Sequence, residues 1–332
     1  MKKTRTWKDI TEIPALLEAF SAGEAKSLKE KALKSSDGFV YLIGRGSSGN
    51  ATLYAKYIWE IYAGVQVGFI HPHAVFEARR EMDFRGKAVW AFSQSGQSPD
   101  VVECLKKLAG WGAETVAVTN EPDLRKNPLA EAAMRHILLS DSRETTVAAT
   151  KTFALELWLS LWTAHVWSGC FKPEDFKKTA ALAEECVSRS ASEDFDFWPE
   201  LKKAGNVAFV GRGPLNAVAE DAALKFREMA GVHAEAHSAA EFLHGPIGAH
   251  GPNDLALLLS PEKKLPADLE KVKKALSERK SPWRAVSYAG VKPPFNSLLV
   301  DILLKIAALR LAVEKGLNPD TPQGLSKVTE TF

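Results

Sequence analysis

The sequence predicts an α/β protein with two tandem domains, each built on a parallel β-sheet, preceded by N-terminal helices and followed by a C-terminal tail. An internal repeat is the first reason. Residues 41–46 recur at positions 208–213, and the same offset of 167 positions places residues 91–93 on residues 258–260 without a gap. The second reason is that short, unbroken apolar runs followed by helical patterns occur in both halves, as expected for strands buried on both faces of a parallel sheet.

The N-terminal region is expected to form two amphipathic helices between residues 7 and 35, because apolar side chains recur at helical spacing and residues 21–23 interrupt them. Five apolar runs predict the strands of the first domain at residues 39–43, 67–70, 88–92, 115–119 and 136–139. A charged helical connection is expected next, over residues 172–198. The strands of the second domain are then expected at residues 207–210, 232–236, 255–259, 285–288 and 297–300.

These elements divide the chain into five segments. They are the N-terminal helices (residues 1–36), a first domain (37–170), a connecting segment (171–200), a second domain (201–316) and a C-terminal tail (317–332). In open parallel sheets, ligands bind beyond the carboxyl ends of the strands, so functional residues are expected in the loops that follow them.

The composition is that of an ordinary globular protein, with 45% hydrophobic and 25% charged residues in a chain of 332. The 43 basic residues nearly balance the 41 acidic ones, which argues against a nucleic-acid-binding surface. Cys104, Cys170 and Cys186 lack metal-site spacing and are expected to be reduced, buried thiols. The N-terminus lacks the apolar run of a signal peptide, and the apolar stretch 154–167 is too short to span a bilayer. We therefore expect a cytoplasmic protein that binds neither nucleic acid nor membranes.

The clearest candidate binding site follows the expected strand 88–92. It is a polar loop made of Ser93, Gln94, Ser95, Gly96, Gln97 and Ser98. Such a loop presents hydroxyls and backbone N–H groups at the positive end of the next helix, where a phosphate monoester binds well. Capping of that helix by a serine is the competing explanation. Hydroxyl-rich loops also follow two other expected strands, at residues 46–50 and 144–152, which favours a phosphate site.

Two common nucleotide-binding motifs are missing from the sequence. It contains no GxxxxGK[ST] segment, and Gly44-Arg45-Gly46 lacks the later glycine and the ribose-binding acid of a dinucleotide fingerprint. A small sugar phosphate therefore fits the loops better than a nucleotide does.

Several segments together resemble the tandem sugar isomerase (SIS) domain proteins, above all the isomerase half of glucosamine-6-phosphate synthase and the glucosamine-6-phosphate deaminases of the same fold. They are residues 93–100, 147–152, 233–236, 241–246 and 325–329. The resemblance implies a doubly wound, flavodoxin-like sheet in each domain. It implies that the phosphate is bound by Ser48, Ser93, Gln94, Ser95 and Ser98, and that Val147 lines the sugar site. The synthase also carries a glutamine-hydrolysing domain with an N-terminal cysteine nucleophile, for which we find no counterpart.

The second half offers acid and base groups instead of phosphate ligands. Lys225 and Glu228 lie three positions apart on an expected helix, and the repeat places Glu228 on Ile61, so the first half lacks this acid. Moving a proton between C1 and C2 of an open-chain amino sugar needs a carboxylate as the acid and base. Burial near an anion would raise the pKa of such a carboxylate toward the range useful for this transfer. Glu228 is the candidate for this transfer, as the resemblance also implies. A solvated surface ion pair is the competing explanation.

The resemblance implies further catalytic roles. His244 would open the sugar ring, a task that suits a group titrating near neutrality, and it would be contributed across a dimer interface. Lys327 would reach the sugar from the tail and engage its carbonyl, for example as a Schiff base. Lys225 would assist proton transfer at the C1 or C2 oxygen. A structural role for His244 is the alternative, and the sequence leaves the roles of Glu235 and His237 open.

The function expected from these residues is that of a glucosamine-6-phosphate deaminase, which converts glucosamine 6-phosphate and water into fructose 6-phosphate and ammonia. We expect a homodimer with a shared active site and no metal or organic cofactor. Deamination is the expected direction because no glutamine-hydrolysing segment is found. A fructosamine-6-phosphate deglycase or an aldose–ketose phosphosugar isomerase would use the same machinery. A sugar-phosphate-sensing regulator is the non-enzymatic alternative, and it could dispense with Glu228, His244 and Lys327.

Overall fold

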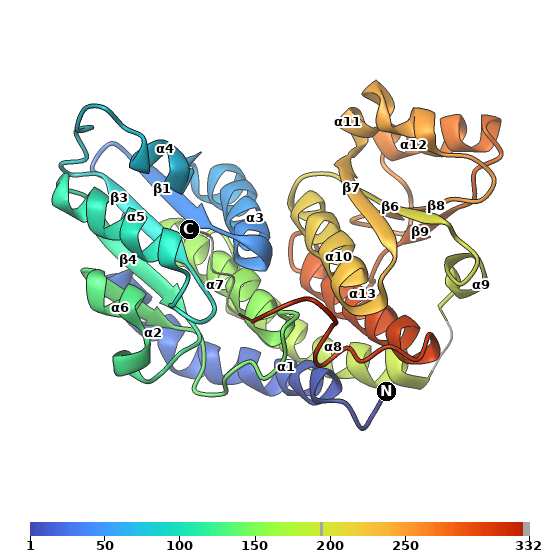
Figure 1. Cartoon of the computed structure of the whole chain (residues 1–332), viewed down its shortest axis with the longest axis horizontal. Coiled ribbons are helices and arrows are strands. Elements are labelled where there is room, and N and C mark those ends of the chain that lie inside the picture. The colour runs from blue at the N-terminus through green and yellow to red at the C-terminus, as the bar shows by residue number, and fades with distance from the viewer. Residues whose placement is uncertain (193–194, 328–332) are drawn as a thin grey trace. The chain divides into compact units, whose positions relative to one another are not determined.

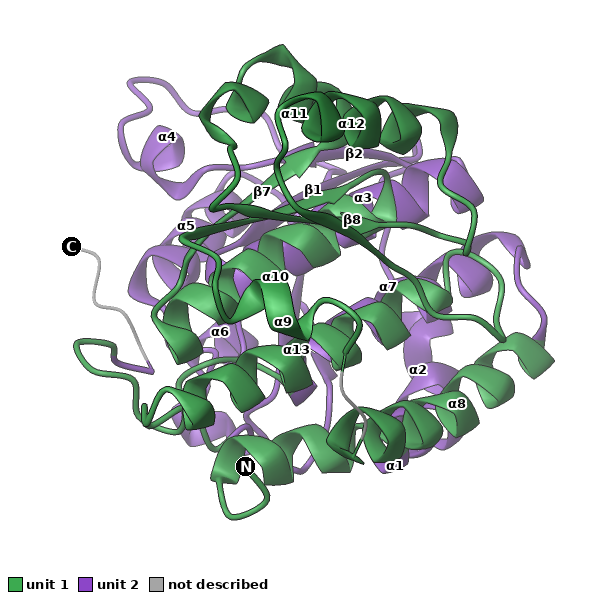
Figure 2. Cartoon of the chain, turned by 90° about the vertical axis from the view of Figure 1, so that its right-hand side faces the viewer, with its two compact units in different colours: residues 1–14, 145–150, 173–325 green, residues 15–144, 151–172, 326–332 purple. Residues whose placement is uncertain are grey.

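The computed structural model describes residues 1–192 and 195–327. The chain divides into two compact units, which are coloured separately in Figure 2. Unit 2 contains the first sheet and comprises residues 15–144, 151–172 and the chain from residue 326. Unit 1 contains the second sheet and comprises residues 1–14, 145–150 and 173–325. The last part of the expected tail, residues 328–332, lies outside the described residues.

Unit 2 is built on a parallel sheet that has five strands within the described residues. Their order is β2 (Gln66–Phe69), β1 (Phe39–Gly44), β3 (Ala88–Phe92), β4 (Glu114–Thr119) and β5 (Arg135–Leu138). All five strands expected in the first half are confirmed, and their bounds differ from the expected ones by at most one residue. The chain order reverses between β1 and β3, so the loops after these strands flank the crevice where open α/β sheets bind ligands.

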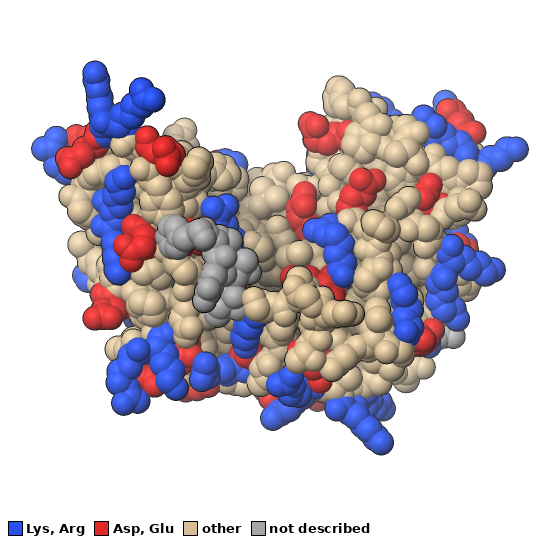
Figure 3. Space-filling view, in the orientation of Figure 1, with Lys and Arg blue, Asp and Glu red and all other residues tan. Residues whose placement is uncertain are grey.

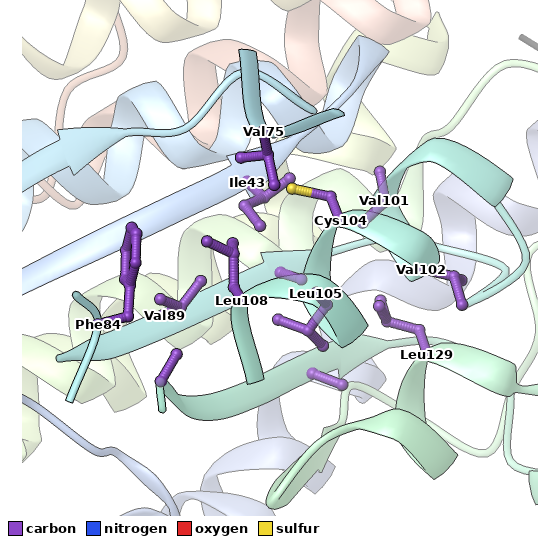
Figure 4. Packing of buried hydrophobic residues seen from close by; sticks show 13 residues of the cluster. Ile43, Val75, Phe84, Val89, Val101, Val102, Cys104, Leu105, Leu108 and Leu129 are labelled. Carbon is purple, nitrogen blue, oxygen red and sulfur yellow. The ribbon is translucent and has the colours of Figure 1, made fainter. Parts of the chain in front are cut away.

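Helices cover both faces of this sheet. Successive side chains of β3 point to opposite faces, so each face of the strand packs against a different helix. Val89 packs with Leu105 and Leu108 of α5 (Pro99–Gly110), as Figure 4 shows. The ring of Trp90 lies 5.1 Å from that of Trp59 in α3 (Gly46–Ala63), on the other face. The remaining helices of the first half are α1 (Arg5–Ala22), α2 (Glu24–Lys31), α4 (Pro72–Phe76), η1 (Leu124–Lys126), α6 (Pro128–Ala132) and α7 (Lys151–Ser168). The two expected N-terminal helices, α1 and α2, are thereby confirmed.

Unit 1 carries a second parallel sheet, with four strands within the described residues. Their order is β7 (His233–Ser238), β6 (Asn206–Gly211), β8 (Leu255–Leu259) and β9 (Trp283–Val286). The fifth strand expected at residues 297–300 is wrong, because these residues begin the helix α13 (Asn296–Glu314). The apolar run continues far beyond the length of a strand, and its buried charges Asp301 and Lys305 lie four positions apart, which is helical spacing. Strand β9 also begins two residues earlier than expected.

The helices of unit 1 repeat the packing seen in unit 2. Figure 1 labels α8 (Pro173–Ser192), α9 (Trp198–Leu201), α10 (Pro214–Ala230), α11 (Ala239–His244), α12 (Ala267–Glu278) and α13, and the short η2 (Pro246–Ala249) follows α11. Helix α10 packs on α13, as α3 packs on α7 in unit 2. Helix α8 lies within the charged segment 172–198 that was expected to connect the halves. The predicted fold class, two tandem doubly wound parallel-sheet domains, is therefore confirmed.

Two structural details show that the internal repeat extends to atomic contacts. A Cβ atom at Gly44 would lie 2.7 Å from the Ser48 carbonyl oxygen, and one at Gly211 would lie 2.4 Å from the Leu215 carbonyl oxygen. Each strand therefore needs a glycine where the following helix passes close to its end. The next residue is an arginine in both halves. Arg45 pairs with Asp100 at 2.7 Å, and Arg212 pairs with Asp268 at 2.6 Å.

The three cysteines are free thiols, and two of them are buried as expected. Cys104 and Cys186 are buried, but Cys170 is exposed, because it follows the end of α7. Burial raises the pKa of the Cys104 thiol to about 12, so this group stays protonated at neutral pH. Among the described residues, no helix is both long and apolar enough to cross a membrane.

Candidate active site

The polar loop expected to bind phosphate connects β3 to α5 in unit 2. Pro99 occupies the first position of α5, and Ser98 precedes it in an extended conformation. The Ser98 side chain makes no capping hydrogen bond, and its hydroxyl lies 3.3 Å from the hydroxyl of Ser93. Simple helix capping, the competing explanation for Ser98, therefore does not describe this loop. Ser93 is buried, whereas Gln94, Ser95 and Ser98 are half-buried.

The backbone of this loop is held in a conformation that only glycine adopts easily. Gly96 has a φ of +66°. A Cβ atom there would lie 2.0 Å from Oδ1 of Asn127. The Ser95 hydroxyl accepts a hydrogen bond from the Gln97 amide at 3.1 Å. The loop thus bends tightly around the N-terminus of α5, which is the geometry expected of an anion-binding turn.

Ser48 lies in the first turn of α3, at the carboxyl end of β1 in the same unit. Its hydroxyl donates a hydrogen bond of 2.8 Å to Oε1 of Glu156, a fully buried residue of α7. In this arrangement the hydroxyl proton of Ser48 points to a carboxylate, so the donor left to a phosphate is its backbone amide at the start of the helix. The sequence indicates Glu156 only as a charged residue inside an apolar helix.

The third loop, between β5 and α7, is fixed by Asn120 at the end of β4. The Glu144 amide donates to Oδ1 of Asn120 at 2.8 Å, and the Glu144 carboxylate accepts from the Thr152 amide at 2.8 Å. Lys327 donates a hydrogen bond from Nζ to the Glu144 carbonyl oxygen. Unit 2 therefore brings Ser48, the loop that contains Ser93, and Lys327 to the carboxyl ends of one sheet.

The predicted residues Val147, Lys225, Glu228 and His244 belong to unit 1. Val147 is half-buried in a segment that Asp9 holds through the amide and hydroxyl of Thr145, at 2.9 and 2.7 Å. His244 is exposed and ends α11.

Lys225 and Glu228 form an ion pair on one face of α10. The Lys225 side chain is only 1% exposed and that of Glu228 is 20% exposed. A solvated surface pair is therefore excluded as the description of these residues. Asp221, one helical turn before Lys225, is fully buried as well, and so are Asp301 and Lys305 on α13.

Glu235 and His237, whose roles the sequence left open, lie on β7 and contact each other. Glu235 Oε1 lies 2.8 Å from His250 Nε2, and its Oε2 lies 3.3 Å from His237 Nε2. Partial burial of Glu235 acts to raise its pKa, but the two histidines outweigh this effect, so the pKa lies below its usual value. His250 carried no signal in the sequence beyond its residue type.

A cavity of about 630 Å³ lies in unit 1, at the carboxyl end of β9. Its lining includes Arg189, Lys263 and Tyr288, but none of the predicted site residues.

On the face shown in Figure 3, acidic and basic side chains are interspersed. This agrees with the near-zero net charge, +2, of the sequence.

Comparison with known proteins identifies relatives of both halves of the chain. The SIS domain profile matches residues 33–165 and 200–282. A glutamine–fructose-6-phosphate aminotransferase (isomerizing) from Sulfolobus acidocaldarius is 28% identical over 303 residues, which cover 88% of this chain and 50% of that protein. The chain thus spans about half the length of the curated relatives it matches.

Two solved structures are similar over nearly the whole chain. One, from Silicibacter pomeroyi, is provisionally named a phosphosugar isomerase; it is 27% identical, with a TM-score of 0.76, and the match covers 96% of this chain and all of that one (100%). The other is glucosamine-6-phosphate deaminase from Thermotoga maritima, with a TM-score of 0.85 and 22% identity, covering 99% of this chain and 100% of that one. The second likeness supports the fold.

Proposed function

The chain belongs to the SIS domain family, and on this premise we propose that it is an enzyme of the phosphosugar isomerase kind that deaminates glucosamine 6-phosphate. The products would be fructose 6-phosphate and ammonia. The observation that carries the proposal is the loop from Ser93 to Ser98, whose hydroxyls are not used to cap α5 and which begins at the topological switch point of the sheet. A phosphate monoester is the ligand that such a loop suits best.

The chemistry would begin with ring opening. His244 would take the proton of the C1 hydroxyl and deliver a proton to the ring oxygen. Glu228 would then remove the proton from C2 and return it to C1, so that the amine becomes a C2 imine. Addition of water to C2 and expulsion of ammonia would complete the reaction. The buried Lys225, paired with Glu228, would stabilise negative charge on the C1 oxygen while the proton moves.

The assembly and the tail belong to the same proposal. We propose a homodimer in which His244 serves the active site of the partner subunit. Lys327 would engage the sugar carbonyl, and its hydrogen bond to the Glu144 carbonyl supports a place for it beside the loop after β5. Val147, in the segment held by Asp9, would line the sugar.

An aldose–ketose isomerisation without loss of nitrogen is the second candidate. The likeness to the Silicibacter pomeroyi protein, which covers its whole length at 27% identity, favours it. Proton transfer by Glu228 would be the same in both reactions, and only the substituent on C2 of the substrate differs. The products therefore discriminate between the two candidates.

The test is a product assay on the purified full chain. We expect ammonia and fructose 6-phosphate in equal amounts from glucosamine 6-phosphate, and a loss of at least about 100-fold in turnover for Glu228→Gln. Glu270→Gln is the matched control, since Glu270 pairs with Lys273 at the same i,i+3 spacing but is 46% exposed. Turnover of a hexose 6-phosphate without ammonia would favour the isomerase. An active Glu228→Gln variant would remove Glu228 from the mechanism.

A further inference from the structure

The Lys225–Glu228 pair is one end of a larger group of charges packed between α10 and α13. The group consists of Asp221, Lys225, Glu228, Asp301 and Lys305. Four of these side chains are at most 2% exposed, and Glu228, at 20%, is the one that approaches solvent. Charged groups are buried at a large free-energy cost unless opposite charges compensate them. Five of them between two helices therefore require a reason, which the packing of the fold alone does not supply.

The contacts within the group run from its buried end to Glu228. Lys305 pairs with Asp301, one turn earlier on α13, and its Nζ lies 3.8 Å from Oδ2 of Asp221 on α10. The Lys225 ammonium is close enough to Asp301 to lower the pKa of that carboxyl. Lys225 in turn pairs with Glu228. Lys305 thus lies between two acids, and one of them, Asp221, is one turn before Lys225 on α10, the helix that also carries Glu228.

The number of charges in the group matters for its behaviour. Three carboxylates face two ammonium groups, so the group would carry one excess negative charge if every member were ionised. Burial raises the pKa of the Asp301 carboxyl to about 7, although Lys305 and Lys225 oppose this effect; Asp221 adds to it. Near neutral pH the group can therefore hold one proton at Asp301 and be neutral.

The other helix packed against α13 is α8, whose Cys186 thiol lies near Asp301 and whose Arg189 guanidinium lies near that thiol. Helix α13 packs on α8 and α10. From α8, Cys186 contacts the Leu299 carbonyl at 3.5 Å, and burial raises the pKa of its thiol to about 12, so it stays neutral. From α10, the facing groups are Asp221 and Lys225. Lys305 is the facing group on α13 itself.

The first half contains a counterpart in which a buried acid supports a predicted site residue. Asp301 is the sixth residue of α13, and Glu156 is the sixth residue of α7. Glu156 accepts the hydrogen bond of Ser48. In both halves, then, the last helix of the unit presents a buried acid toward the helix that carries a predicted functional side chain.

We propose that Asp301 and Lys305 are positioning residues that hold Lys225 against Glu228, so that the charge of Glu228 acts on Asp301 through Lys225. The catalytic part of this inference rests on the proposed function, but the coupling does not. Because coupling between two sites is reciprocal, removing the charge of Glu228 must change the titration of Asp301. Without Glu228, Lys225 acts on Asp301 alone, which favours the ionised form of the Asp301 carboxyl.

The first experiment requires no turnover. Carbon-13 NMR of aspartate-labelled full chain follows the carboxyl titrations, and the Asp301 signal is the one lost in Asp301→Asn. We expect its midpoint to fall by about one pH unit in Glu228→Gln. In the control Glu270→Gln it stays in place. An unchanged midpoint in Glu228→Gln would overturn the coupling, whether or not the chain deaminates a sugar.

The second experiment measures catalysis. Asp301→Asn is expected to lower kcat by about 10-fold with KM within about twofold, because substrate binding is left intact. It should also remove one inflection near pH 7 from the kcat profile. Glu314→Gln, which removes the exposed acid of the Arg310–Glu314 pair on the same helix, should change neither. Wild-type kcat and an unchanged pH profile in Asp301→Asn would overturn the positioning role. If Asp301→Asn does not fold, the double variant D301L/K305M, which replaces the buried pair by apolar side chains, takes its place.

Discussion

The two halves of the chain share a fold and differ in the residues that are proposed to bind and convert the substrate. Both end their first strand with Gly-Arg-Gly, and both pair that arginine with an acid in the first turn of a later helix, Asp100 or Asp268. The loop after β3 differs from the loop after β8: Ser98 precedes α5, whereas Pro266 precedes α12. The buried acid of the last helix differs too, since Glu156 accepts a hydrogen bond from a serine and Asp301 pairs with Lys305. The comparison teaches that the duplicated contacts maintain the fold, and that the residues free to diverge carry the proposed function.

The largest expected effect is on the pH dependence of stability. It concerns Asp301, the buried acid of the second half, and tests how this acid differs from Glu156 in the first half. The pKa of Asp301 is about 7 in the folded chain and 3.8 as its ordinary value. Between these values the folded state binds a proton that the unfolded state has lost, so stability falls as pH rises. From pH 5 to pH 8 the wild type should lose about 3 kcal/mol more than Asp301→Asn. Urea unfolding at both pH values measures this.

Glu314→Gln is the control for that measurement, since it removes an exposed acid from the same helix. It should retain the wild-type loss of stability. If Asp301→Asn retained the loss as well, Asp301 would be ionised throughout this range, and the buried charges of α10 and α13 would not share a proton.

The second effect tests the duplicated glycines. Alanine at Gly44 or at Gly211 places a Cβ atom within 2.7 or 2.4 Å of helix backbone, which cannot move as a side chain does. Each substitution should lower the free energy of unfolding by about 2–3 kcal/mol. Only Gly44→Ala should also raise the KM for the phosphosugar, because it displaces Ser48. Thermal unfolding and steady-state kinetics measure the two effects, and equal KM changes in both variants would contradict the division between the halves.

Much of the fold was predictable from the sequence, because the strands of a buried parallel sheet are short apolar runs between polar loops. The first-half strands and the loop from Ser93 to Ser98 were found in this way. The error at residues 297–300 arose because four apolar residues look alike in a strand and in a buried helix. The run is resolved as a helix only when Asp301 and Lys305 are included at their spacing of four.

The site was predictable where its residues are close in sequence, and not where they meet across helices. Lys225 and Glu228 are three apart, so their pairing could be inferred. Ser48 and Glu156 are 108 positions apart, and nothing in the local pattern of either indicates the other. The same holds for Asp301 and Lys225, whose relation depends on how α10 packs on α13.

The third effect compares equivalent serines. Ser93 and Ser260 occupy the same position of the repeat, but the Ser260 hydroxyl donates to the Lys264 carbonyl at 3.3 Å, and its loop lacks the serines of the first half. Ser93→Ala should raise the KM for the phosphosugar by about 10-fold, the loss of roughly one hydrogen bond to a charged group. Ser260→Ala should leave KM within about twofold. Steady-state kinetics measures both KM values. Equal changes in KM for the two variants would mean that the phosphate is not bound by the loop of the first half alone.

The smallest effect concerns the arginines that both halves retain. Arg45 and Arg212 have side chains that are 51% and 72% exposed, so their ion pairs with Asp100 and Asp268 are screened by water. Replacing Arg212 with methionine should lower the free energy of unfolding by about 0.5–1 kcal/mol, as for exposed pairs elsewhere. Arg45→Met should cost more, because Asp100 is nearly buried and would be left without its cation at the N-terminus of α5. A double-mutant cycle with Asp100→Asn and Asp268→Asn separates each pair energy from the loss of the arginine itself. A coupling energy that is larger for the Arg212 pair would show that exposure does not control the strength of this repeated contact.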